Sequence, residues 1–67
     1  MKNSIKVERA KKNITQAQLA ELVNVSRQTI NAIELGKYSP SLEVAFRIAG
    51  VFQLSIDEVF QHNREGE

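Results

Sequence analysis

Signals that begin an α-helix recur about every ten to fifteen residues along this chain, and this spacing constrains its fold more than any other feature. Two of the signals are capping boxes, in which a cap residue and the residue three positions later accept hydrogen bonds from each other's backbone N–H groups. Thr15 pairs with Gln18 in the first box, and Ser55 pairs with Glu58 in the second. Strand-like alternation of apolar and polar residues is short-lived. The pattern therefore predicts an all-α, compact fold of five short helices.

Residues that favour turns separate the predicted helices. Asn24 tolerates left-handed backbone angles, and Gly36 occupies a position that commonly follows a helix. Ser26 is a good cap for the third helix, while either Ser39 or Ser41 can cap the fourth. The predicted helices cover residues 4–12, 16–23, 27–35, 41–52 and 55–61, with a frayed tail at 62–67.

The predicted helix over residues 41–52 is apolar along one side, which identifies it as the central core helix. A domain of this size buries only about 60% of its unfolded surface, so its apolar residues must be used efficiently. The 42% content of hydrophobic residues is enough for a modest core. The apolar side of this helix comprises Leu42, Ala45, Ile48, Ala49 and Phe52.

Composition argues against several classes of function. The chain has no cysteine, and a lone histidine, His62, cannot hold zinc by itself, so no metal ion or cofactor is expected. No apolar run is long enough for a bilayer and no secretory signal begins the chain, so we expect a cytoplasmic protein without membrane contact. No catalytic residues are expected, because no nucleophile–base pair, spaced carboxylate pair or glycine-rich phosphate loop is visible.

Charge is unevenly distributed along the chain, although the net charge is only +1. Residues 1–40 carry a net charge of +4 and residues 41–67 a net charge of −3. This division suits a molecule with one phosphate-facing side. An ordinary solvated surface fits the same counts equally well, so charge alone decides nothing.

Residues 16–35 satisfy the requirements of a rigid corner between two helices. The small residue Ala20 stands where the helices cross closely, and Asn24 stands in the three-residue turn. Apolar side chains close the inside of the corner: Leu19, Val23, Val25, Ile30 and Ile33. Because all these features occur together at suitable spacings, they predict a helix-turn-helix.

The outer side of the second helix in this corner carries polar side chains. At about 100° per residue, Ile30 and Ile33 face the core, and Arg27, Gln28 and Asn31 lie on the opposite side. Arginine binds guanine through two hydrogen bonds, and glutamine or asparagine binds adenine in the same way. Three polar residues on a surface helix are often only a solvated face. The surrounding corner favours contact with bases in the major groove.

Three segments carry a family resemblance: residues 15–20 (TQAQLA), 25–30 (VSRQTI) and 33–37 (IELGK). Residues 40–42 (PSL) and 56–60 (IDEVF) extend it. Together they closely resemble the phage-repressor/Cro (Xre) family, especially its short stand-alone, cytolysin-repressor-like regulators. The resemblance covers residues 5–61 and implies a five-helix domain that binds double-stranded DNA, usually as a homodimer on a two-fold-related operator.

The same resemblance implies roles for individual residues. Gln16 is expected to bind a backbone phosphate at the start of its helix, and Arg9 and Glu34 are expected to form an architectural ion pair. Asn24 replaces the usual turn glycine, and Leu35 replaces a polar residue. Positions implied to meet bases or nearby phosphates are Ser26, Arg27, Gln28, Thr29 and Asn31. The loop implied to hold the DNA backbone comprises Lys37, Tyr38 and Ser39, although Tyr38 can instead pack on the domain edge.

Apolar residues near the C-terminus suggest self-association: Phe52, Leu54, Ile56, Val59 and Phe60. One domain that contacts about four or five base pairs binds too weakly to find an operator. Two copies on half-sites one helical turn apart (about 34 Å) solve this problem. We expect Val59 and Phe60 in the core, and Leu54 and Ile56 in an isologous interface. The alternative places all of them in the core.

These observations predict a DNA-binding transcription regulator, with repression as the expected mode of action. A protein-interaction module is the alternative. Such a module would be an antitoxin or phage antagonist whose helix-turn-helix corner holds a protein partner.

Overall fold

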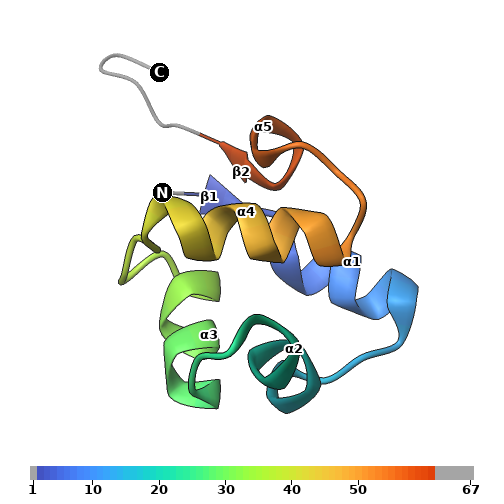
Figure 1. The fold of residues 1–67 in the computed structure, drawn as a ribbon, viewed down its shortest axis with the longest axis vertical. Helices are drawn as coiled ribbons and strands as arrows, with labels where there is room; N and C mark the ends of the chain where they lie inside the picture. Colours follow the sequence, from blue (N-terminus) through green and yellow to red (C-terminus); the bar gives the residue numbers. More distant parts are fainter. Residues whose placement is uncertain (1, 62–67) are drawn as a thin grey trace.

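The computed structural model describes residues 2–61, and within them it forms five helices and one two-stranded sheet. The predicted all-α class is confirmed. Helix α4 crosses the middle of the molecule, with α2 and α3 on one side and α5 with the sheet on the other (Figure 1). The elements are α1 (Ile5–Lys12), α2 (Gln16–Val23), α3 (Arg27–Glu34), α4 (Leu42–Val51), α5 (Ile56–Val59), β1 (Lys2–Asn3) and β2 (Phe60–Gln61). The predicted tail at 62–67 lies outside the described residues.

The predicted caps begin four of the helices. In each case a hydroxyl accepts a hydrogen bond from the backbone N–H three residues later, at Thr15, Ser26, Ser41 and Ser55. Both capping boxes are present, and Ser41 rather than Ser39 caps α4. The Ser55 backbone N–H and hydroxyl both hydrogen-bond Glu58, and these bonds lower the pKa of its carboxyl below the ordinary value of 4.5.

Four residues with left-handed backbone angles turn the chain between elements. Asn24 has φ 63° and Gly36 has φ 76°, as predicted. Asn13 (φ 60°) and Gln53 (φ 58°) were not predicted. Asparagine adopts this conformation at modest cost, whereas glutamine has no such advantage. Gln53 follows the end of α4 and redirects the chain toward α5.

The two-stranded sheet corrects the predicted C-terminal boundary. Helix α5 was expected to reach Gln61, but it ends at Val59, because Phe60 is extended and pairs antiparallel with Asn3. The Ser4 N–H donates to the Val59 carbonyl at 2.8 Å, and the Asn3 side-chain amide donates to the Ile33 carbonyl at 2.9 Å. The N-terminal segment thus joins α5 to the end of α3. Helices α1, α3 and α4 differ from their predicted bounds by a residue at one or both ends.

The core is built mainly from one side each of α2, α3 and α4. Val59 and Phe60 are buried as predicted, whereas Leu54 and Ile56 are half-buried against the core. The placement of Leu42 in the core was wrong: this side chain lies at the start of α4 and is 68% exposed. The buried set is Ile5, Leu19, Ala20, Val23, Ile30, Ile33, Ala45, Ile48, Ala49, Phe52, Val59 and Phe60.

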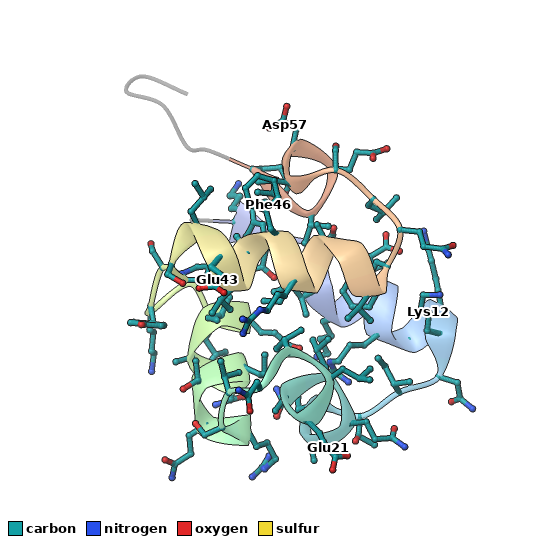
Figure 2. The ribbon with its side chains drawn as sticks, in the orientation of Figure 1. Lys12, Glu21, Glu43, Phe46 and Asp57 are labelled. Atoms are coloured by element: carbon teal, nitrogen blue, oxygen red, sulfur yellow. The ribbon has the colours of Figure 1, made fainter. Side chains whose placement is uncertain are left out.

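Exposed apolar side chains also occur on α4. Phe46 is 59% exposed and points from α4 toward the side of the molecule that carries α5 (Figure 2). It lies one helical turn after Leu42, so the two side chains are neighbours on the helix surface. Leu42 was predicted to be in the core, and exposure of Phe46 was not predicted. Within residues 2–61, no helix has the length and apolar character needed to cross a membrane.

Candidate nucleic-acid interface

The corner between α2 and α3 fixes the orientation of α3. Ala20 is 3% exposed at the packed face of α2, and Ile30 and Ile33 bury the inner face of α3. The Val25 N–H donates to the Ala20 carbonyl at 3.0 Å, which closes the turn after Asn24. The predicted helix-turn-helix is therefore formed, and the outer face of α3 points away from the core.

This outer face presents the polar side chains singled out from the sequence. Arg27, Gln28 and Asn31 are all exposed, on the side opposite the two buried isoleucines. Ala32, which is half-buried, lies beside Gln28 one turn later and was not identified from the sequence. The face is thus a charged and amide-rich edge with a small apolar residue at its side.

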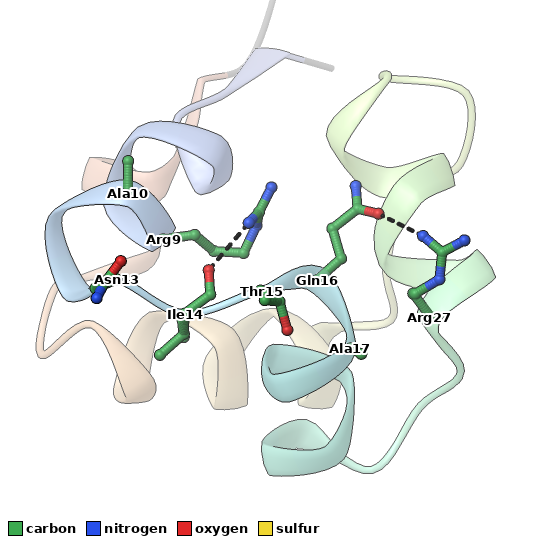
Figure 3. Close-up of a pocket in the computed structure, with 8 residues that line it drawn as sticks. All are labelled: Arg9, Ala10, Asn13, Ile14, Thr15, Gln16, Ala17 and Arg27. Carbon is green, nitrogen blue, oxygen red and sulfur yellow. Dashed lines mark hydrogen bonds between the residues drawn. The ribbon is translucent and has the colours of Figure 1, made fainter.

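Gln16 links α2 directly to this edge. Its side-chain carbonyl accepts a hydrogen bond from Arg27 Nη1 at 3.2 Å (Figure 3). Its amide nitrogen donates to Asn31 Oδ1 at 3.0 Å and to Glu34 Oε1 at 3.1 Å. The residue expected to bind phosphate therefore also holds two of the residues expected to contact bases.

The Arg9–Glu34 ion pair forms the inner end of the same chain of contacts. Arg9 Nε and Nη2 donate to the two carboxylate oxygens of Glu34, at 2.7 and 3.2 Å. Arg9 Nη1 also donates to the Ile14 carbonyl at 3.1 Å (Figure 3). Only 15% of the Arg9 side chain and 7% of the Glu34 side chain are exposed. This pair joins α1 to α3 and supplies a fixed acceptor for Gln16.

The N-terminus of α2 opens onto a hollow of about 420 Å³. The hollow lies between α1 and the start of α2, and both Arg9 and Arg27 line it (Figure 3). The first N–H groups of a helix have no helical partners and carry partial positive charge, so they favour an anion. The positive helix end makes this hollow suitable for a phosphate, whereas the charge of Arg9 is already paired with Glu34.

The loop between α3 and α4 lies beside the other end of the α3 edge. Lys37, Tyr38 and Ser39 are all exposed, and Tyr38 has 54% of its surface accessible. A second hollow, of about 260 Å³, separates Tyr38 from α3. The residues around it are Ser26, Gln28, Thr29, Ala32 and Tyr38.

Two of these residues also stabilise the start of α3. Ser26 Oγ accepts from the Thr29 N–H at 3.0 Å, and the two hydroxyls lie within hydrogen-bond distance at 2.9 Å.

In the part of the chain that the structure describes, no group of three histidine, cysteine, aspartate or glutamate side chains is placed to hold a metal ion.

Known proteins are similar to this chain in sequence. The model of the helix-turn-helix family matches residues 5–59, so the chain belongs to this family. It is 55% identical over 60 residues to an uncharacterised HTH-type transcriptional regulator of Methanocaldococcus jannaschii, covering 90% of this chain and 91% of that protein. It is 45% identical over 60 residues to the HTH-type regulator YgzD of Bacillus subtilis, with the same coverage of 90% and 91%.

A phage protein extends the comparison. The immunity repressor protein of Bacillus phage phi105 is 36% identical over 55 residues, which are 82% of this chain and 38% of the repressor. The resemblance to phage-repressor-type regulators is thereby confirmed. The chain is a DNA-binding regulator of the helix-turn-helix family, and these relatives are named as transcriptional regulators or as a repressor.

Proposed function

We propose that this protein is a sequence-specific repressor that binds a two-fold-related operator as a homodimer, with α3 in the major groove. The observation that carries this proposal is the exposed edge of Arg27, Gln28 and Asn31, held outward by a buried corner. The name of the phage relative, an immunity repressor, supports repression. Such a regulator would act in the cytoplasm, where its DNA lies.

Each side chain at the interface has a proposed partner on DNA. Arg27 is suited to guanine, while Gln28 and Asn31 are suited to adenine, through the hydrogen-bonding edges of these bases. Phosphate contacts are assigned to Gln16, Lys37, Tyr38 and Ser39, which lie at the start of α2 and in the loop after α3. Ser26 and Thr29 are assigned to bases or phosphates at the start of α3.

Selection of bound fragments from random duplex DNA tests this function. We expect an enriched sequence with two half-sites related by a two-fold axis and separated by about one helical turn. Affinity for it is expected to fall steeply with added salt, because each phosphate contact releases counterions. Failure to enrich any duplex, even at low ionic strength, would overturn the proposal. It would favour the protein-interaction module.

In the proposed homodimer, the two copies associate through Leu54 and Ile56. Both side chains are half-buried at the α5 side of the molecule, and the exposed Phe46 points toward that side. An isologous interface there would cover apolar surface that the monomer leaves partly accessible. Packing of the same residues against their own core is the competing arrangement.

Ile56→Asp is expected to give a helical monomer, because an isologous apolar interface would have to take a carboxylate out of water in both copies without a partner of opposite charge. Loss of bivalent attachment should weaken operator binding by about a hundredfold or more. Sedimentation velocity and circular dichroism measure the two effects. Val7→Asp places the same charge on an exposed apolar residue of α1 and should leave the dimer intact. An Ile56→Asp protein that still sediments as a dimer would show that the interface lies elsewhere.

A further inference from the structure

No group of the DNA has yet been assigned to Ala32 or to the hollow between α3 and Tyr38, although the other residues that line the hollow have proposed contacts. We propose that it receives the C5 methyl group of a thymine in the major groove, next to the base pair that Gln28 contacts. This inference rests on the proposed function, since it assumes that α3 enters that groove. It names a further determinant of operator sequence, formed by Thr29, Ala32 and Tyr38.

The position of the hollow on α3 carries the first part of the argument. Ala32 follows Gln28 by four residues, so both lie on the same outward side of the helix. Gln28 is exposed, Thr29 and Ala32 are half-buried, and all three line the hollow from α3. Tyr38 closes the opposite side from the loop. A base edge that meets Gln28 therefore has this hollow beside it.

The chemistry of the walls favours an apolar group over a phosphate. No lysine or arginine lines the hollow, which holds about 260 Å³. The Ser26 and Thr29 hydroxyls hydrogen-bond each other at 2.9 Å, and Ser26 Oγ also accepts from the Thr29 N–H. The apolar groups that the lining residues offer are the Ala32 methyl, the Thr29 methyl and the Tyr38 ring. Thymine C5 methyl is the apolar group that bases present in the major groove, and alanine and threonine methyl groups are suited to contact it.

Replacement of each thymidine in the selected duplex by deoxyuridine tests this inference, since only the methyl group is removed. We expect one position in each half-site, adjacent to the adenine that Gln28 contacts, where the change weakens binding about fourfold. If every deoxyuridine duplex binds as tightly as its parent, the inference is wrong and the proposed function stands. If no duplex is enriched at all, both fail.

Two variants assign the methyl contact to this hollow. Ala32→Gly removes one lining side chain and should reduce the deoxyuridine effect to nearly none. Ala10→Gly, at an exposed position of α1, controls for the loss of helix propensity and should leave the ratio of affinities for the thymidine and deoxyuridine duplexes unchanged. Tyr38→Ala removes the opposite wall without altering a helix and should act like Ala32→Gly. A deoxyuridine effect that persists at full size in the wall variants would place the methyl group elsewhere and overturn the inference.

Discussion

Glu34→Ala is expected to lower the free energy of unfolding by about 3 kcal/mol, because it leaves the guanidinium of Arg9 without its carboxylate partner in a site with little solvent. The Glu34 side chain is 7% exposed and accepts from both Arg9 and Gln16. A single core of this size rarely supplies more than about 3–5 kcal/mol. The variant should therefore be largely unfolded at modest temperature, which urea denaturation followed by circular dichroism measures.

The Glu43–Arg47 pair provides the matched control. It joins the same residue types across one turn of α4, but the Glu43 side chain is 73% exposed. Exposed pairs contribute little, so Glu43→Ala should cost less than about 0.5 kcal/mol. Equal losses in the two variants would contradict the assignment of Arg9 and Glu34 as the structural pair.

A double variant separates the effect of the Arg9–Glu34 pair on stability from its effect on the position of the DNA-facing side chains. Replacing the pair together, as Arg9→Met with Glu34→Leu, removes both charges and should recover much of the stability, since buried ion pairs are often replaceable by apolar residues. It also removes the acceptor that Glu34 offers to the Gln16 amide. A stable double variant with altered base preference would show that the pair also positions the DNA-facing side chains.

Arg27→Ala is expected to relax base discrimination at one position of each half-site by about 1–3 kcal/mol, roughly 5- to 150-fold in relative affinity. The reason is the loss of paired hydrogen bonds to one base, which the phosphate contacts cannot replace. Competition binding measures it, with the selected duplex set against a duplex changed at the contacted guanine. Helical content should be preserved, because Arg27 is exposed.

Lys37→Ala is the control for this effect. Lys37 is exposed in the loop after α3, and its proposed contact is to phosphate. Its loss should weaken binding to all duplexes about equally and reduce the salt slope by about one. Gln16→Ala is less suitable, because Gln16 also holds Arg27 and Asn31. If Arg27→Ala weakened every duplex equally, Arg27 would be a phosphate contact instead.

The features predicted correctly from sequence depend on short-range chemistry. A capping serine or threonine needs only the N–H groups of its own first turn, so Thr15, Ser26 and Ser55 could be identified directly. The left-handed turns at Asn24 and Gly36 also depend on the residue that occupies them. For the same reason, the polar outer face of α3 follows from helical periodicity alone.

Apart from the left-handed turns at Asn13 and Gln53, the features that were missed depend on residues distant in sequence. The pairing of Asn3 with Phe60 involves strands of two residues, which are too short to produce an alternating pattern. Leu42 fits the apolar stripe of its helix, yet its position at the start of α4 leaves it exposed. Periodicity shows which side of a helix faces inward, but it does not show how far the neighbouring elements extend.

The geometry of the candidate interface could be predicted only in part, because it also depends on residues distant in sequence. Its candidate residues followed from periodicity and resemblance, but the bonds from Gln16 to Asn31 and Glu34 required the crossing of α2 and α3. The hollow beside Ala32 required the path of the loop that carries Tyr38. Neither the hydrogen bonds of Gln16 nor the hollow can be predicted from a pattern in the sequence alone.

The central claim is that the outer edge of α3 contacts the DNA. Backbone amide shifts of the isotope-labelled protein, followed by NMR during titration with the selected duplex, test it most directly. We predict the largest changes from Ser26 to Ala32 and at Gln16, with smaller changes around Tyr38. Largest changes along α4 from Leu42 to Phe46, with α3 unaffected, would contradict the claim.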